Sequence, residues 1–399
     1  MGGRPAAVGR IAAAPIAIAA ALTAASAQGA PFVPADDSVV LETGLPNADP
    51  RVRQMRALAD DLKARPGDLE LAMQLAGRQL AMGVAEADPR FVGYAEATLG
   101  PWWRDPAPQT AVLVLRARIK QAQHNFVEAA ADLRAALRQD PANPTALLVL
   151  ASVDEVSGEF DEAKLACATF GAARPGLAVT ACIASVAGVT GDAASSGAAL
   201  AEAVRNAPTR DRSVQVWALT ILAEIATRLE DPKAESYYEE ARGLDGGNVY
   251  LLTAFADYLL DQGHPEKDIP LLLGFERIDP LYLRLALAAQ AAHDPRFPAF
   301  RDGVAGRLAA ARRQGDKLHL RDDSRFALEI EHDAPGALSF AELNWETHKT
   351  PADARVLVDA AIASQDRSAA APVAEFVANT HLEDKGLARR LAVLGFGAE

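Results

Sequence analysis

The chain has 399 residues, of which half are hydrophobic and only 6% aromatic, and its formal net charge is −13 at pH 7. This acidic balance argues against nucleic acid and anionic membrane surfaces as main partners. An Ala-rich composition with few aromatic residues favours closely packed helices over a β-rich core. A chain of this length forms about two or three globular domains, unless it is a repeat array in which each unit contacts only its neighbours.

Residues 1–27 have the layout of a cleaved export signal. Arg4 and Arg10 precede an apolar run over 11–25, and Ala25-Ser26-Ala27 supplies a small-x-small cleavage site. The run is shorter than the roughly 20 residues of a membrane span, and a retained anchor is the alternative. We therefore expect cleavage after Ala27, a periplasmic or secreted protein with no membrane span, and an extended lead-in over 28–48.

The next strong pattern is a self-match at a shift of 34 residues. Six pairs of identical residues have this spacing, among them Phe126 and Phe160, Ala129 and Ala163, and Pro141 and Pro175. A fixed period of this length marks stacked helix–turn–helix units, none of which buries its own apolar face alone. Gly158 ends one helix by accepting a left-handed conformation, and proline stops the next. The pattern predicts an all-α, right-handed α-solenoid.

This pattern resembles the tetratricopeptide repeat family, in which an aromatic residue, small residues and a proline recur along a 34-residue unit. Units 110–143 and 144–177 match the family well, and 214–248 matches recognisably, although Arg116 and Lys120 stand where the family has apolar residues. The resemblance implies that the first helix of each unit lines a concave groove that binds an extended peptide or a partner helix. The corresponding groove positions are Val114, Arg118, Gln121, Leu148, Ser152 and Glu155. The family's clamp for a terminal carboxylate is not expected, because two of its polar positions hold Val114 and Leu148.

Helical hairpins are predicted along the rest of the chain. A helix over 49–64 comes first, and Asp-Pro pairs such as Asp88-Pro89, Asp231-Pro232 and Asp294-Pro295 mark helix starts. About nine hairpins follow from these signals, and we place them at 67–103, 110–143, 144–177, 178–208, 214–248, 249–278, 279–315, 318–350 and 351–382. A last helix over 384–394 would cap the stack. A Gly-rich stretch near 191–212 divides an N-terminal array, 49–208, from a more degenerate C-terminal array, 209–399.

The two cysteines, Cys167 and Cys182, fall in successive helices on either side of a turn near 174–176. In an antiparallel pair both stand at about the same height, and a disulfide needs Cα atoms within about 7 Å. An exported protein meets an oxidising compartment, so we predict a bridge. The alternative is a pair of small buried hydrophobic side chains.

The sequence contains no Gly-x-Ser-x-Gly, His-Glu-x-x-His, phosphate-loop or Cys-x-x-Cys motif. The densest titratable cluster is Glu329, Glu331, His332 and Asp333. Zinc-type ligand spacing is absent there, and the interpretation of Asp333 as a helix cap is preferred. Trp102-Trp103 is either an exposed partner anchor or, as we prefer, a pair with one ring wedged between hairpins.

These observations predict an exported protein–protein interaction scaffold that is not an enzyme and uses no cofactor or metal. Its partner would be a protein or peptide held in the concave groove, with no role for nucleic acid. The alternative is a helical-repeat scaffold subunit of an envelope enzyme, or of an assembly or secretion system. The sequence does not identify the partner.

Overall fold

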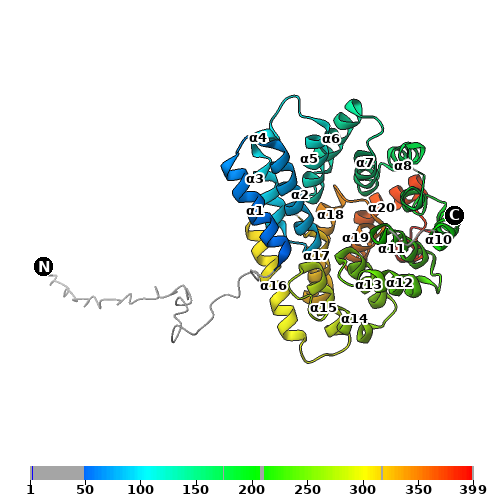
Figure 1. Ribbon diagram of the computed structural model, residues 1–399. Helices are drawn as coiled ribbons and strands as arrows, with labels where there is room; N and C mark the ends of the chain where they lie inside the picture. The colour runs from blue at the N-terminus through cyan, green and yellow to red at the C-terminus, as the bar shows by residue number, and fades with distance from the viewer. Residues whose placement is uncertain (1, 3–48, 174, 207–210, 316–317, 398–399) are drawn as a thin grey trace. The chain divides into compact units, whose positions relative to one another are not determined.

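The computed structural model describes residues 2, 49–173, 175–206, 211–315 and 318–397 (Figure 1). These residues contain α-helices, one π-helix and no β-strand, which confirms the predicted all-α helical-repeat fold. Residues 51–399 form one compact unit, and the predicted division at 208/209 stays a prediction. The predicted signal peptide, 1–27, and lead-in, 28–48, lie outside the described residues apart from residue 2.

The helices pair in chain order at all of the predicted hairpin positions. After α1 (Pro50–Ala64), the pairs are α2 (Leu69–Ala85) with α3 (Pro89–Thr98), α5 (Thr110–Ala122) with α6 (Phe126–Gln139), α7 (Pro144–Ser157) with α8 (Phe160–Ala173), α9 (Leu177–Ala187) with α10 (Ala193–Asn206), α11 (Arg212–Leu229) with α12 (Ala234–Leu244), α13 (Val249–Asp261) with α14 (Pro265–Leu272), α15 (Asp279–Ala291) with α16 (Phe297–Arg313), α17 (Leu320–Arg325) and its π-helical continuation η1 (Phe326–Glu331) with α18 (Ala334–Trp345), and α19 (Pro351–Ala363) with α20 (Arg367–Thr380). The short α4 (Gly100–Trp103) connects the first two pairs, and α21 (Lys385–Val393) follows the last.

Each of these hairpins turns through one residue with a positive φ angle. The turn residues are Ala87, His124, Gly158, Gly191, Glu230, Gly263, His293, His332 and Gln365. A left-handed residue after a helix lets the chain reverse while the last carbonyls keep their hydrogen bonds. Most of these residues are not glycine, so the conformation is imposed by the hairpin rather than by the local residue.

The Asp-Pro signals mark two kinds of helix start. Asp88 caps α3 directly, because its side chain accepts a hydrogen bond from the Arg90 amide. At Asp231 and Asp294 the prediction was early, since α12 and α16 begin three residues later. There the aspartate accepts from the amide two residues on, at 2.9 and 2.8 Å, and forms a turn that precedes the helix.

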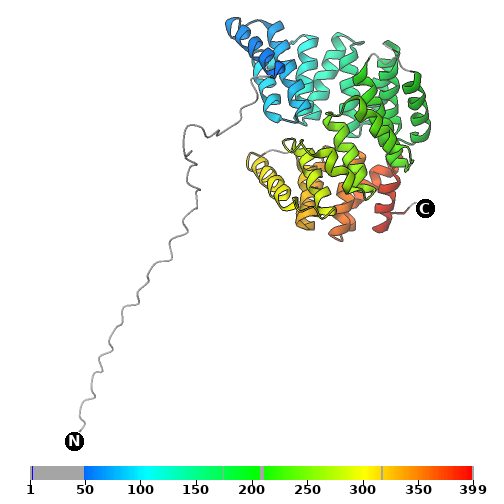
Figure 2. The same cartoon turned by 60° about the horizontal axis from the view of Figure 1, so that its bottom comes forward.

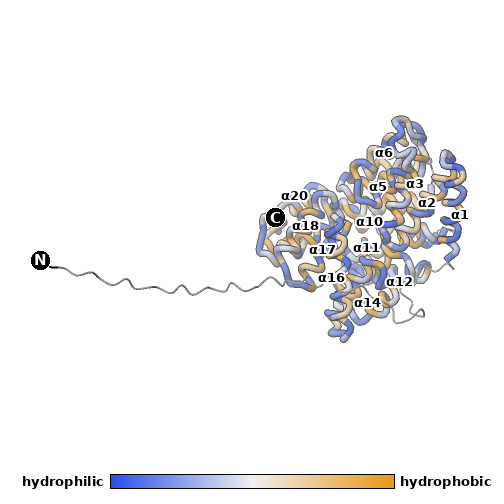
Figure 3. The backbone as a smooth tube through the Cα atoms, turned by 90° about the vertical axis from the view of Figure 1, so that its left-hand side faces the viewer, coloured by the Kyte–Doolittle hydropathy of each residue, from blue (hydrophilic) through white to orange (hydrophobic). Residues whose placement is uncertain are grey.

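The hairpins pack through small apolar residues at the predicted repeat spacing. Alanines 117, 129, 136, 151 and 163 are at most 3% exposed. Without long side chains at these points, neighbouring helices approach closely. Figure 3 shows hydrophobic and hydrophilic stretches alternating along the helices, as expected of helices with one buried face.

The two polar departures from the repeat pattern form a half-buried ion cluster. Arg116 and Lys120 both reach Asp132, with nitrogen–oxygen distances of 2.6 and 2.7 Å. Asp132 is only 7% exposed. The three charges therefore compensate one another where the pattern calls for apolar packing.

The C-terminal hairpins form a second layer against the first. We call α2 to α13 (residues 69–261) the first tier and α17 to α21 (residues 320–393) the second tier. Figure 2 shows the yellow-to-red helices beneath the cyan-to-green ones. Hydrogen bonds join the hairpin turns of the first tier, in order, to later segments: Arg277 to Glu86, His348 to His124, the Lys349 amide to the Val156 carbonyl, Glu383 to the Ala193 amide, and Lys385 to the Leu229 carbonyl.

This layering corrects the expectation that each unit contacts only its neighbours. Lys349 and Val156, which bond at 2.7 Å, are separated by six hairpin turns. The array curves enough that the chain comes round to its own edge, where polar groups at the turns provide hydrogen-bond partners. The concave surface therefore belongs to a structure in which two tiers of the same chain contact each other.

Candidate functional site

The first helices of successive hairpins line the inner side of the first tier. They contact one another directly along the series α5, α7, α9, α11 and α13. We call the accessible residues that follow the predicted groove register along these helices the inner wall. Its members are Arg118, Gln121, Leu148, Ser152, Glu155, Ser185, Glu224 and Tyr250.

Five of the six predicted groove residues have accessible surface. Arg118 and Ser152 are exposed, and Gln121, Leu148 and Glu155 are half-buried. Val114 is a correction: it is 7% exposed and packs in the core with neighbours such as Phe126 and Leu150. The apolar face of α5 extends far enough to include this position, so Val114 offers no surface to a partner.

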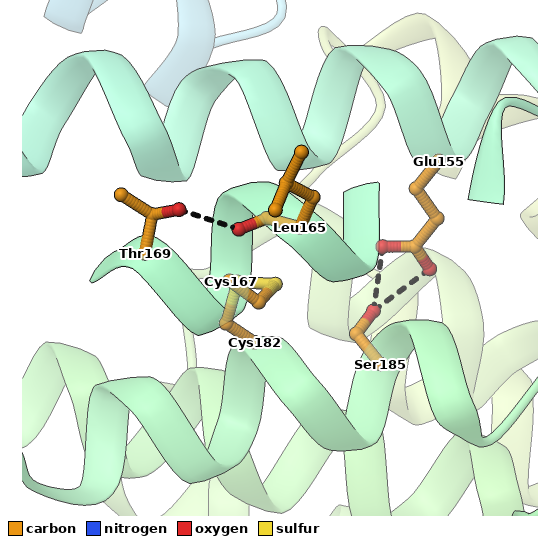
Figure 4. Close-up of a disulfide and its surroundings, with 6 residues drawn as sticks. All are labelled: Glu155, Leu165, Cys167, Thr169, Cys182 and Ser185. Atoms are coloured by element: carbon orange, nitrogen blue, oxygen red, sulfur yellow. Dashed lines mark hydrogen bonds between the residues drawn. A yellow bond between two sulfur atoms is a disulfide. The ribbon is translucent and has the colours of Figure 1, made fainter. Parts of the chain in front are cut away.

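A series of hydrogen bonds connects neighbouring first helices along the inner wall. The Gln121 amide donates to Ser152 at 3.1 Å, the Ser185 hydroxyl lies 2.8 Å from both oxygens of Glu155 (Figure 4), and the Tyr250 hydroxyl donates to Glu224 at 2.6 Å. The spacings within these pairs, 31, 30 and 26 residues, are all shorter than the 34-residue period, but each pair joins two successive first helices. The bonds therefore fix α5 against α7, α7 against α9, and α11 against α13.

Three inner-wall members were missed by the sequence argument. Ser185, Glu224 and Tyr250 lie in units whose match to the repeat pattern is weak or that follow the last good match. A signal existed, because Glu224 lies 69 residues after Glu155, one residue more than two 34-residue periods. Helix lengths vary between these units, which hides the register when identical residues are sought.

Two carboxyl groups on the inner wall lack a cationic partner among the described residues. Burial raises the pKa of Glu155 to about 7, the Ser185 hydroxyl opposes this, and the nearby charge of Glu224 adds to it. Burial likewise raises the pKa of Glu224. The nearest cation, Arg228, is buried and donates to the Gly188 carbonyl at 3.1 Å. Both carboxyl groups are thus poised to gain from a positive group brought by a partner.

Arg118 gives the inner wall a positive charge, which complements the carboxyl groups of Glu155 and Glu224. Its side chain has no hydrogen bond or ion pair with any described residue, although it is exposed on the inner wall. Desolvation by the surrounding wall lowers the pKa of Arg118, and no carboxylate opposes it. Arg116, two residues earlier, points the other way and is fully engaged with Asp132 and the Trp103 carbonyl. Arg118 is therefore available to a carboxylate from outside.

The inner surface continues past the first tier into a buried ionic network. Arg284, only 1% exposed, contacts Asp257 at 2.8 Å and Asp322 at 3.1 Å, and Arg325 also contacts Asp257. The two arginines hold the pKa of Asp257 well below its usual range despite burial. The network joins α13, α15 and α17, and so connects the two tiers.

A pocket of about 260 Å³ adjoins this network. It is lined by Leu260, Asp261, Leu287, Gln290, Ala291, Arg325 and Glu329. Its two carboxylates are each committed to an arginine, Asp261 to Arg355 at 3.0 Å and Glu329 to Arg325 at 2.8 Å. Burial nevertheless raises the pKa of Asp261, and the charge of Arg355 opposes this rise.

The predicted titratable cluster at 329–333 is dispersed by the fold. Asp333 caps α18 by accepting from the Gly336 amide at 3.1 Å, His332 is the left-handed turn residue, and Glu329 pairs with Arg325. These contacts support the interpretation as a helix cap. Within the described residues no group of three or more His, Cys, Asp or Glu is arranged to hold a metal ion.

Both members of the tryptophan pair are half-buried. Trp103 packs against the core between the first two hairpins, and Lys120 lies over its ring at 5.9 Å. The preferred interpretation, with one ring wedged between hairpins, agrees with the position of Trp103. Trp102 is half-buried like Trp103, so it does not stand out as an exposed anchor for a partner protein.

Cys167 on α8 and Cys182 on α9 are joined by a disulfide, with their Cα atoms 5.6 Å apart (Figure 4). Both residues are buried, at 0% and 3% exposure. The bridge links one hairpin to the next directly behind the inner wall. Among the described helices, none is both long enough and apolar enough to span a bilayer.

Comparisons with known proteins agree on the kind of repeat. Residues 121–180 match the tetratricopeptide repeat model. No curated protein matches the sequence. Similar solved structures include the human IFIT1 dimer with PPP-AAAA (14% identity, 86% of this chain and 94% of that chain, TM-score 0.43), the APC/C hetero-tetramer Cut9–Hcn1 (13%, 86% and 87%, 0.40) and yeast Tom70 (11%, 87% and 95%, 0.25). At such low identities and TM-scores, these likenesses carry no argument about partners.

Proposed function

We propose, from the premise that this chain is built of tetratricopeptide repeats, that it is an exported, non-catalytic scaffold that holds a partner protein or peptide against its inner wall. Repeat arrays of this kind are generally protein–protein interaction scaffolds. The observation that carries the proposal is Arg118, an accessible arginine without a partner among the described residues, in a wall where neighbouring polar groups are joined to one another.

The inner wall supplies the features that recognition of an extended segment requires. Arg118 is suited to a carboxylate, whereas Glu155 and Glu224 are suited to a positive group. Tyr250, which is 59% exposed, adds aromatic surface beside Glu224. The partner segment that fits best therefore carries an acidic residue followed, along the groove, by a basic one.

Export is supported by two independent features. The first 27 residues have the layout of a signal peptide. The disulfide between Cys167 and Cys182 is of the kind that persists in oxidising compartments. Cell fractionation of an epitope-tagged full-length chain tests this part: the protein is expected in the envelope fraction, shortened by the signal peptide.

A pair of charge reversals tests the groove. The partner is first identified by cross-linking in intact cells, and its affinity for the purified mature protein is then measured. Arg118→Glu should weaken binding at least tenfold, because it replaces an attraction by a repulsion in a desolvated wall. Arg138→Glu, at an exposed position on the second helix of the same hairpin, is the matched control and should leave the affinity unchanged. Equal effects of the two reversals would sink the proposal.

A further inference from the structure

The two tiers meet through a pair of histidines. Nε2 of His348, in the connection between α18 and α19, lies 3.1 Å from Nδ1 of His124, in the turn between α5 and α6. The two rings are 4.6 Å apart and half-buried. Phe126 packs on both, with ring centroids 5.6 Å from His124 and 5.0 Å from His348. A polar contact between residues 224 positions apart thus lies beside an aromatic ring.

Neighbouring contacts concentrate at the same place. The Lys349 amide donates to the Val156 carbonyl at 2.7 Å. Gly158 is so close to the second tier that an added Cβ would lie 2.9 Å from the Phe376 ring. The α18–α19 connection therefore fits against the edge of the first tier, next to the helix that carries Ser152 and Glu155.

The hydrogen bond between the histidines requires that at least one imidazole is neutral. The Thr347 hydroxyl lies 2.9 Å from Nδ1 of His348. If that hydroxyl donates, Nε2 of His348 carries the proton and donates to Nδ1 of His124. When both rings are protonated, every ring nitrogen is a donor, the bond is lost, and two cations face each other at this distance.

The charged groups around the pair come from three elements. Arg321 on α17 and His319 just before it face His124, Asp353 on α19 faces both rings, and Lys349 is adjacent in the chain. Burial is the main reason that the pKa of His124 falls to about 3, with His348 and Arg321 adding to the effect and Asp353 opposing it. Burial also lowers the pKa of His348, again opposed by Asp353.

We infer that this contact is an acid-released latch: protonation of His124 and His348 separates the α18–α19 connection from the first tier and uncovers the adjacent edge of the inner wall. The inference rests on the proposed function in one respect only, namely that the edge uncovered by the latch belongs to a surface that holds a partner. Its release is a property of the chain alone and is measured without any partner, so its failure and that of the proposed function are distinguishable.

The direction of the pH effect follows from linkage. A histidine whose pKa is lowered in the closed state stabilises that state fully at pH values above the ordinary histidine pKa of about 6.5. This stabilisation is lost progressively as the pH falls from 6.5 towards the closed-state pKa. With a closed-state pKa of about 3, His124 alone raises the opening equilibrium about 30-fold between pH 7.5 and pH 5.0. His348 acts in the same direction.

Hydrogen exchange at single amides tests the latch in the mature protein. The Lys349 amide reports the contact between tiers, and the Ala129 amide, bonded to the Asn125 carbonyl within its own hairpin, reports the first tier. Between pH 7.5 and pH 5.0 the protection factor of Lys349 should fall at least tenfold while that of Ala129 is kept. Unchanged protection at Lys349, or equal loss at both amides, would overturn the inference.

Variants separate the histidines from other acidic effects. His348→Gln keeps a hydrogen-bonding side chain that does not titrate, and it should abolish most of the pH dependence at Lys349. His264→Gln, at an exposed histidine beside Glu266, is the matched control and should behave like the unaltered chain. An unaltered pH dependence in His348→Gln overturns the latch. Should that variant not fold, titration of the His124 ring by NMR decides: an ordinary pKa near 6.5 overturns it equally.

Discussion

The two tiers use the same hairpin plan but are stabilised by different means. In the first tier, buried alanines at the repeat spacing bring helices together, and a disulfide links two hairpins. In the second tier, arginine–aspartate pairs do much of the joining: Arg321 with Asp353, Arg355 with Asp384, and Arg390 with Asp359. Apolar packing tolerates small shifts, whereas a buried ion pair depends on both partners and on their geometry. The second tier should therefore be the more sensitive to single charge changes.

The largest expected effect comes from breaking the ionic network that connects the tiers. Arg284→Met leaves Asp257 and Asp322 without their buried arginine, and we expect a loss of about 3–5 kcal/mol in the free energy of unfolding. Guanidinium denaturation of the disulfide-intact protein measures it. Arg301→Met, which removes an exposed pair with Asp302, should cost less than about 1 kcal/mol.

A triple variant sharpens the same comparison. Replacing Asp257 and Asp322 by leucine together with Arg284→Met removes Arg284 and both of its carboxylates, while Arg325 keeps its pair with Glu329. Most of the lost stability should return because no buried charge is left unpaired. If the triple variant is less stable than Arg284→Met alone, the network stabilises the junction beyond charge compensation.

An intermediate effect is expected at the contact of the tiers. Gly158→Ala places a methyl group 2.9 Å from the Phe376 ring and 3.1 Å from Lys349, at a φ of 82°. Gly263→Ala is the control, since its φ is 73° but nothing lies within 4 Å of the added Cβ. Both variants share the left-handed strain of about 1 kcal/mol, and Gly158→Ala should cost about 1–3 kcal/mol more through overpacking. Equal losses in thermal or chemical denaturation would show that the tiers do not press on this turn.

The smallest effect is a gain in stability. Gln365 is an exposed turn residue of the second tier with a φ of 54°. Gln365→Gly should stabilise the chain by about 0.5–1 kcal/mol, because glycine adopts this conformation without strain. The opposite is expected of Ala168→Gly, at an exposed site inside α8, where glycine costs about 1 kcal/mol. A loss of stability in Gln365→Gly would mean that the side chain contributes more than the strain removes.

Much of the candidate site was accessible from the sequence because repeats carry register. The 34-residue register and the resemblance to the repeat family predicted Arg118, Gln121, Ser152 and Glu155 as groove residues, and each of them has accessible surface. Val114 was misplaced because a 34-residue register does not report how wide the buried face of a helix is. Glu224 and Tyr250 were missed because their hairpins keep the fold with different helix lengths.

The sequence by itself determined the helices, their pairing and the direction of the stack. Those features depend on residues close together in the chain: apolar periodicity, Asp caps, prolines and small residues at a fixed spacing. The tertiary structure alone decided that the array returns to its own edge, that Arg284 joins the tiers, and that His124 meets His348. The reason is that small rotations between hairpins add up along the array, and no local signal encodes their sum.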